Sequence, residues 1–183
     1  MIGPYLIQRI VLCSADASPR SQRRRPCNAA SFYPGAKWVG AMRNAATRLG
    51  CNLVIITTAH GMVNPEDEIG PYDLHIRGHE EEVRSIWRRT IPLVLGQDQF
   101  DILVLYFGGC PRYPALEIIR EILHGMHISL ITFGKPNMFD IDRVDDLVHQ
   151  LENGTSLEEL RSLTGCPERL EFFPANDRLS RGC

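Results

Sequence analysis

Four apolar runs, each about the length of one strand, constrain the fold of this chain more than any other feature. They read YLIQRIVLC at residues 5–13, NLVIITT at 52–58, DILVLYF at 101–107 and HISLITF at 127–133. The last three have almost no polar alternation, which indicates strands buried on both faces. Strands of this kind belong to parallel sheets that are covered by helices.

Segments with the apolar spacing of helices separate these runs. They span residues 36–50, 80–95, 114–125 and 141–151. Gly50 is expected to cap the first, and Pro92 to kink or end the second. The alternation predicts an α/β fold, with a mostly parallel sheet of about four strands and helices on both faces. We assign residues 1–151 to this domain, and 152–183 to a short helical C-terminal appendage and a tail.

Composition excludes several classes of protein. The formal net charge is only -2, so the chain as a whole has no charge that would draw it to nucleic acid or to a membrane surface. No apolar run approaches the ~20 residues of a membrane-spanning helix. The N-terminal run lacks the basic segment of an export signal, and the six cysteines show no CxxC spacing. We therefore expect a cytoplasmic protein with reduced thiols, without a membrane partner, a metal or a cofactor.

Ligands of parallel α/β sheets bind beyond the carboxyl ends of the strands. Polar or flexible residues directly follow each predicted strand: Cys13-Ser14, His60-Gly61, Gly108-Gly109 and Gly134-Lys135. All of them are expected at one rim of the sheet. The loop that begins at His60 would then form one wall of a ligand site.

This loop holds most of the candidate chemistry. His60 is placed to act as a general base, or else to fix the turn before Gly61 by hydrogen bonding. Asp67 is a possible ligand contact, but it also suits closure of a turn after a proline. Tyr72 is suited to stack on a planar ligand, and Asp73 beside it to handle a proton or to cap the next segment.

Two further groups belong to the same predicted rim. The arginines suit phosphate, because a guanidinium binds it bidentately, although a solvated loop tip has the same composition. They are Arg20, Arg23, Arg24 and Arg25. Cys13 could pair with His60 as a nucleophile, or could simply pack in the core.

Glycines and a tyrosine follow the third apolar run. Gly108 and Gly109, followed by Tyr113, would let a ligand approach the backbone closely. This pair is neither the G-x-G-x-x-G fingerprint nor a P-loop, so dinucleotide binding and a standard NTPase are rejected.

The stretch TTAHGMVNPEDEIGPYDLHI resembles a pattern of the peroxide-stress YaaA proteins and of a related family of bacterial, archaeal and phage domains. The matching positions are Cys13-Ser14, Tyr33, Gly35, Trp38, Ala59-His60-Gly61, Pro65, Asp67, Ile69, Pro71-Tyr72-Asp73, Gly108 and Tyr113. The similarity covers roughly residues 10–135. The chain departs from the pattern early in the first loop and at FGKPNMFD. The resemblance implies a layered α/β fold like that of uracil-DNA glycosylase, and roles in DNA protection or nucleic-acid base modification.

Two functions of different class follow from the residues and the resemblance. The first is an enzyme directed at a nucleobase, nucleoside or nucleotide, which cleaves an N-glycosidic bond or exchanges a base. Tyr72 or Tyr33 would stack on the base, His60 or Asp73 would handle the proton or water, and the arginines would hold phosphate. The alternative is a non-catalytic DNA- or RNA-binding protein of the YaaA stress-response type, with the Pro-Tyr-Asp loop as scaffold.

Overall fold

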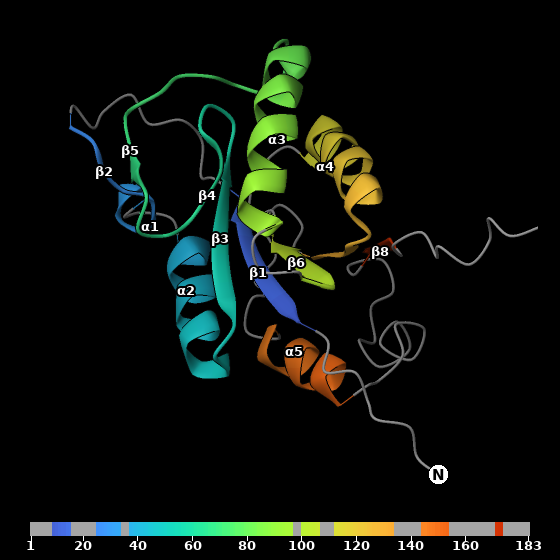
Figure 1. The fold of residues 1–183 in the computed structure, drawn as a ribbon. Helices are drawn as coiled ribbons and strands as arrows, with labels where there is room; N and C mark the ends of the chain where they lie inside the picture. The colour runs from blue at the N-terminus through green and yellow to red at the C-terminus, as the bar shows by residue number, and fades with distance from the viewer. Residues whose placement is uncertain are drawn as a thin grey trace, which may run out of the picture.

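A six-stranded sheet forms the centre of the protein in our computed structural model (Figure 1). The structure describes residues 9–15, 25–33, 37–96, 100–106, 112–133, 144–153 and 171–173. The strands are β1 (Ile10–Ala15), β3 (Asn52–Thr57), β4 (Gly61–Val63), β6 (Ile102–Tyr106), β7 (Ser129–Phe133) and β8 (Glu171–Phe173). Their order is β4-β3-β1-β6-β7-β8. The four central strands β3, β1, β6 and β7 are parallel, and the two edge strands are antiparallel to their neighbours.

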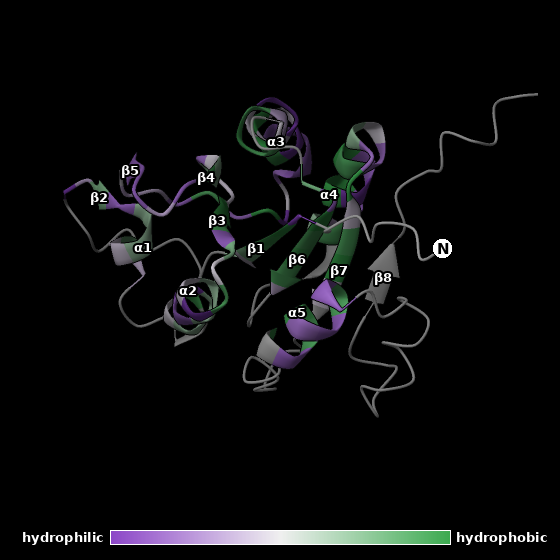
Figure 2. Ribbon diagram, turned by 60° about the horizontal axis from the view of Figure 1, so that its bottom comes forward, coloured by the Kyte–Doolittle hydropathy of each residue, from purple (hydrophilic) through white to green (hydrophobic). Residues whose placement is uncertain are grey.

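Helices cover both faces of this sheet, as predicted. They are α2 (Lys37–Leu49), α3 (Glu80–Leu95), α4 (Arg112–Met126) and α5 (Val144–Glu152). Side chains of α3 and α4 form one core with one face of the strands, and side chains of α2 and α5 form a second core with the other face. Figure 2 shows the hydrophobic strands β1, β6 and β7 between helices of mixed hydropathy. The α/β fold with helices on both faces is therefore confirmed.

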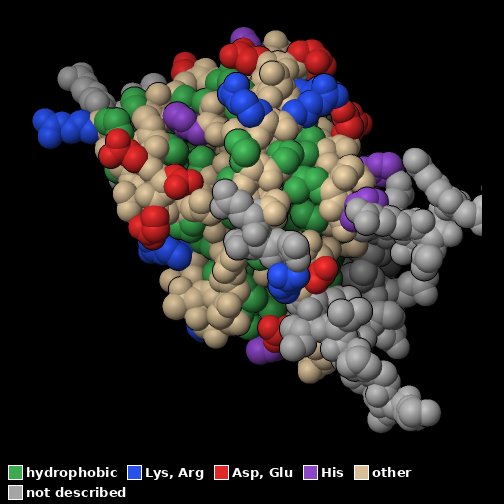
Figure 3. Space-filling model, in the orientation of Figure 1, with side chains coloured by type: hydrophobic (Ala, Val, Ile, Leu, Met, Phe, Trp, Pro, Cys, Tyr) green, Lys and Arg blue, Asp and Glu red, His purple; other side chains and the backbone are tan. Residues whose placement is uncertain are grey.

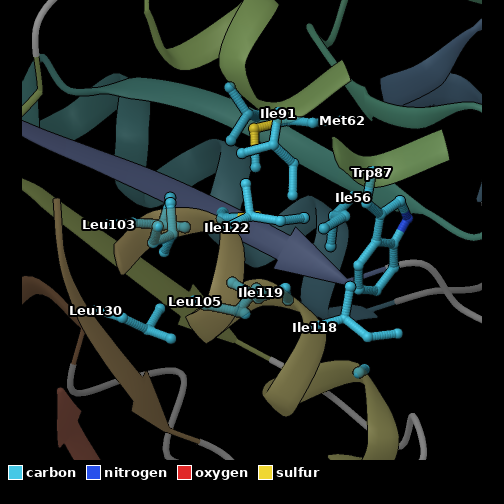
Figure 4. Close-up of a cluster of buried hydrophobic side chains, with 14 of the residues drawn as sticks. Ile56, Met62, Trp87, Ile91, Leu103, Leu105, Ile118, Ile119, Ile122 and Leu130 are labelled. Atoms are coloured by element: carbon cyan, nitrogen blue, oxygen red, sulfur yellow. The ribbon is translucent and has the colours of Figure 1, made fainter. Parts of the chain in front are cut away.

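The apolar runs form strands because both of their faces are buried. Every residue of β1 and of β6 is buried. Successive side chains of a strand point to opposite faces, so Leu103 and Leu105 enter the α3–α4 core while Val104 enters the other. Figure 4 shows the first of these cores, where Ile118 and Ile122 of α4 lie close to strand side chains. A sheet with one solvated face would have needed polar alternation, which these runs lack.

The helix boundaries agree with the local sequence signals. Gly50 follows α2 with a φ of 67°, and the N–H of Cys51 donates to the carbonyl of Ala46 at 3.0 Å. This is the Schellman arrangement that a terminal glycine favours. Pro92 lies inside α3, which continues to Leu95. The helix therefore has the predicted span of residues 80–95, and of the two roles predicted for Pro92 the one of ending the helix is wrong. Gly96, four residues after Pro92, closes the helix by donating to the Pro92 carbonyl.

Several short elements were not predicted. The segment between the first predicted strand and the first predicted helix contains β2 (Cys27–Asn28) and α1 (Ala29–Phe32). β2 pairs with β5 (Glu68–Ile69) in a separate two-stranded sheet. Figure 1 shows β2, β5 and α1 together at one side of the molecule, beside β4. β8 comes from the segment predicted to be an appendage and tail, and it pairs with β7. Apart from residues 152–153 and 171–173, the predicted appendage and tail lie outside the described residues.

Candidate ligand site at the carboxyl edge of the sheet

The strand order places a reversal of direction between β1 and β6. The chain passes from β1 through α2 to β3 on one side of β1, and then returns through α3 to β6 on the other side. The connections that leave β1 and β6 therefore lead to helices on opposite faces of the sheet. In open parallel sheets the ligand crevice lies beyond the carboxyl ends of two such strands.

Ser14 and Tyr106 are register partners at the carboxyl ends of these two strands. Ser14 is two positions after Leu12 in β1, so the two side chains point to the same face of the sheet. Leu12 and Tyr106 belong to the same core, and Ser14 therefore faces that core too. Ser14 is fully buried, and its hydroxyl donates to the carbonyl of Ala15 at 3.2 Å. The side chains of Ser14 and Tyr106 therefore lie next to each other at the reversal point, on the face covered by α2 and α5. Tyr106 was not among the predicted site residues, although it stands near the end of the run DILVLYF.

The loop after β3 is held by its own polar residues. The N–H of His60 donates to Thr57 Oγ1 at 2.9 Å, and Thr58 Oγ1 donates to the Leu74 carbonyl at 2.5 Å. Trp87 Nε1 of α3 donates to the carbonyl of Thr57 at 2.8 Å. The end of β3 is thereby tied to both the distal part of the loop and the helix that follows. These two threonines were missed, although hydroxyl residues at the end of an apolar strand are a usable signal for such a role.

Gly61 allows the chain to turn back as β4. Its φ is 76°, which L side chains rarely adopt, and a Cβ there would collide with the side chain of Thr90 on α3. Thr90 Oγ1 donates to the carbonyl of Ile86 at 3.0 Å and accepts the N–H of Met62 at 3.2 Å. Gly61 therefore acts through backbone conformation and close packing. It is placed at the rim as predicted.

The same loop captures the first turn of α1. The N–H groups of Ala29 and Ala30 donate to the carbonyls of Asp67 and Pro65 at 2.8 and 3.0 Å. The first N–H groups of a helix have no acceptor within the helix, so the loop carbonyls provide the acceptors for the first turn of α1. In addition, Asn28 Nδ2 donates to the Glu66 carboxylate at 2.9 Å. The segments before α2 and after β3 therefore form one docked unit.

Four rings meet inside this unit. Tyr72 stacks on Phe32 with the centroids 6.0 Å apart and the planes at 14°, and Tyr33 meets Phe32 edge-on at 5.2 Å. The hydroxyls of Tyr33 and Tyr72 are 2.6 Å apart and buried. The ring of His60 meets Tyr72 edge-on at 5.3 Å. We call Phe32, Tyr33, His60 and Tyr72 the aromatic cluster.

The aromatic cluster changes the role expected of the two tyrosines. Tyr33 and Tyr72 were predicted to stack on a planar ligand, but they are only 2% and 9% exposed and already pack against protein rings. The cluster also contacts Ile55 of β3, which is the register partner of Ser14. The cluster therefore lies beside β3, the strand next to β1, and His60 is its half-buried member.

The hydrogen bond of His60 defines which ring nitrogen is available. Nε2 lies 3.0 Å from the carbonyl oxygen of Gly70. A carbonyl only accepts, so Nε2 carries the proton and a neutral ring keeps its lone pair on Nδ1. Among the residues that the structure describes, no hydrogen bond reaches Nδ1. His60 both fixes the loop and presents a nitrogen that can accept a proton.

The two loop carboxylates lie in different surroundings. Asp67 Oδ2 accepts the N–H of Asn64 at 2.7 Å, and the N–H of Asp67 donates to the Asn64 carbonyl at 3.1 Å. This is the turn-closing role that the sequence allowed for Asp67. Asp73 lies on the surface, 3.6 Å from His75 Nε2, with 75% of its side chain exposed. An exposed carboxylate of this kind does not share the enclosed position of His60.

Cys13 is fully buried in the core beneath α3 and α4. Desolvation raises the pKa of its thiol far above the ordinary value, because burial penalises the thiolate. A thiol held neutral and enclosed is not a nucleophile. The alternative pairing of Cys13 with His60 is therefore wrong, and the packing role is correct.

The remaining predicted residues are only partly described. Arg25 is exposed at the start of β2. Arg20, Arg23, Arg24, Gly108 and Gly109 lie outside the described residues, as do Gly134 and Lys135. Tyr113 belongs to α4, and its side chain is not described. In the sequence, the arginines belong to the segment that follows β1, and Gly108 and Gly109 belong to the segment that follows β6. These are the two strands at the reversal point.

Two adjoining clefts lie at the opposite, amino edge of the sheet. They measure about 310 and 290 Å³ and share Cys51, Asn52 and Phe100. The first also reaches Glu152, which together with burial raises the pKa of the Cys51 thiol, burial being the larger cause. Neither cleft contains a residue that the sequence predicted to be functional.

The strand topology and the residues at the carboxyl edge of the sheet define the structural class of the protein. This is a mostly parallel α/β protein with a reversal point at the carboxyl edge, and with an aromatic cluster that includes His60 beside β3. Residues 10–117 match the model of DUF6884, a family of unknown function, and the chain belongs to this family. The matched range includes β1, the aromatic cluster and the start of α4. No curated protein and no solved structure matched the chain. Of the helices that the structure describes, none is long and apolar enough to cross a membrane.

Proposed function

We propose that the protein is an enzyme that acts on a nucleobase, nucleoside or nucleotide bound beyond the carboxyl ends of β1 and β6. The observation that carries the proposal is the ring of His60, in the turn that follows β3: Nε2 is held by the Gly70 carbonyl, and no hydrogen bond among the described residues reaches Nδ1. The ligand class rests on the resemblance of the HGMVNPEDEIGPYD stretch to the YaaA proteins and their relatives. The protein's location in the cytoplasm stays a prediction.

His60 is the group that would move the proton. In hydrolysis of an N-glycosidic bond, water oxygen bonds to C1′ as the C1′–N bond breaks. The departing base takes the electron pair, and Nδ1 of His60 takes a proton from the water. A neutral imidazole can serve this step because its free ring nitrogen accepts a proton. Asp73, the other predicted catalytic residue, is less suited because it is exposed and lies beside His75.

The described surface gives no support to the alternative of a nucleic-acid-binding protein. Over α3 and α4, basic and acidic side chains are interspersed (Figure 3). Arg88 bonds Glu121, and Arg84 bonds both Glu121 and Glu81, so these two arginines are balanced by two carboxylates. Binding to a phosphate backbone needs clustered charge of one sign.

The test is a thermal-shift and turnover screen with nucleobases, nucleosides, nucleotides and short oligonucleotides. Wild type is compared with His60→Gln and Asp73→Asn, with His75→Gln as the matched surface histidine. A nucleoside or nucleotide at 100 times its dissociation constant should stabilise the fold by about 2.7 kcal/mol. We expect turnover of that ligand to be lost in His60→Gln and kept in His75→Gln.

Three outcomes would overturn the proposal. Loss of turnover in Asp73→Asn with activity retained in His60→Gln would move the base to Asp73. Stabilisation only by oligonucleotides, abolished by salt and retained in His60→Gln, would identify a binding protein. Stabilisation by no member of the panel would remove the ligand class.

A further inference from the structure

The orientation of the His60 imidazole depends on two contacts. The bond from the His60 N–H to Thr57 Oγ1 fixes only the backbone. The ring itself is held by the Nε2 bond to the Gly70 carbonyl and by the edge-on contact with Tyr72, at 84° between the planes. Gly70 and Tyr72 are two residues apart in one segment. Whatever anchors Tyr72 therefore anchors both contacts.

Tyr72 is anchored from another part of the chain. Its ring lies flat on Phe32, and its hydroxyl pairs with that of Tyr33 at 2.6 Å, so both partners come from the segment around α1. The pair joins residues 39 positions apart. A buried hydroxyl that loses its partner is costly, which makes the pair a strong constraint on the ring position. The position of His60 thus requires the loop before α2 and the loop after β3 to be docked.

We infer that Tyr72 and Tyr33 are positioning residues for His60, an inference that rests on the proposed function for its catalytic meaning. Tyr72 forms the wall against which the imidazole lies, and Tyr33 locks Tyr72 through the hydroxyl pair. Together they hold the imidazole in the orientation in which Nε2 donates to the Gly70 carbonyl, which keeps the lone pair on Nδ1 in one direction. This role replaces the ligand-stacking role that the sequence suggested, because both tyrosine rings already pack against Phe32 in the aromatic cluster.

The inference can be tested without a substrate. Long-range ¹H–¹⁵N spectra of protein labelled at histidine report the tautomer of each neutral ring. In wild type, His60 should be wholly the Nε2–H tautomer, whereas the exposed His75 and His79 should be mixtures. Tyr72→Leu, which removes the wall, should make His60 a mixture like His75. An unchanged His60 tautomer in folded Tyr72→Leu overturns the inference.

Two milder variants keep the test decisive if Tyr72→Leu does not fold. Tyr72→Phe and Tyr33→Phe keep both rings but break the hydroxyl pair. Each should speed exchange of the His60 Nε2 proton with water by about fivefold, which corresponds to one net hydrogen bond of about 1 kcal/mol. Ile118→Val, a core change in α4, controls for lowered stability and should leave this rate unchanged. Equal exchange in all three variants would show a merely structural pair.

Kinetics separates this inference from the proposed function. With a substrate from the panel, Tyr72→Leu should lower kcat more than it changes KM, and Tyr72→Phe should restore most of kcat. If no substrate is found but the tautomer responds as described, the proposed function fails while the positioning role stands. If turnover depends on His60 but the tautomer ignores Tyr72, the positioning role fails alone.

Discussion

Substitution of Gly61 by alanine should destabilise the fold far more than a glycine replacement usually does. Two separate effects add at this position. A φ of 76° is left-handed, which costs an L residue about 1–2 kcal/mol. The new Cβ would also lie 2.7 Å from Thr90 Cβ and 2.8 Å from Thr90 Cγ2, closer than carbon atoms approach.

Relief of the collision requires Thr90 to move. Thr90 is β-branched and its hydroxyl bonds both Ile86 and Met62, so movement weakens two hydrogen bonds of about 1 kcal/mol each. Overpacking of a filled site costs about 1–3 kcal/mol in general. The expected loss in the free energy of unfolding is therefore about 2–5 kcal/mol in total, with the weakened hydrogen bonds counted within the overpacking cost.

Urea unfolding with two matched glycines separates the effects. Gly78 has a φ of 83°, but a Cβ added to it would have no atom within 4 Å, so Gly78→Ala measures the backbone cost alone. Gly40, inside α2, has neither constraint, and Gly40→Ala should stabilise by about 0.5–1 kcal/mol. The double variant Gly61→Ala/Thr90→Ala should recover part of the loss. If Gly61→Ala costs no more than Gly78→Ala, the packing argument is refuted.

Three further predictions concern other parts of the fold. Trp87→Phe should lower the free energy of unfolding by about 1–3 kcal/mol, because the Thr57 carbonyl loses a buried donor; no change in urea unfolding would count against that bond. Cys13 should resist iodoacetamide in the folded protein and react fully in urea, as read by mass spectrometry, because burial raises its pKa; rapid labelling under native conditions would contradict its placement. The bond from Arg88, followed by its charge and that of Arg84, lowers the pKa of Glu121 below its ordinary value of 4.5. Since a lowered pKa in the folded state stabilises above the unfolded value and is lost as pH falls through the folded value, Glu121→Gln should flatten the decline of stability below about pH 4.5, and an unchanged acid limb would exclude this contribution.

The sheet could be predicted because its strands are buried on both faces. Runs such as ILVLY leave no solvent-facing residue, so the sequence alone indicates a parallel, helix-covered strand. The order of the strands could not be predicted, because β1 pairs with β3 and β6 through backbone hydrogen bonds that do not depend on which side chains it carries. Short elements were missed for a different reason. β2 and β5 have two residues each, too few for any periodicity, and they form because they pair with each other.

Some of the predicted site residues are neighbours in the structure, but in roles that the sequence did not show. Tyr33, Tyr72 and His60 pack together, whereas Asp67 closes a turn with Asn64. Their partners were invisible in the sequence, because the Tyr33–Tyr72 contact joins distant segments. A buried tyrosine and a ligand-stacking tyrosine look the same in a loop sequence. Only the tertiary pairing assigns Tyr72 to the first kind.

Binding of a nucleobase-containing ligand at the reversal point between β1 and β6 is tested most directly by backbone ¹H–¹⁵N chemical-shift mapping. The protein is titrated with the nucleoside or nucleotide that stabilises the fold most. We expect saturable shifts at Ser14, His60 and Tyr106, at the carboxyl edge, and none at Asn52 and Asp101, at the amino edge. Shifts confined to the amino edge, where the two clefts share Cys51 and Phe100, would contradict it.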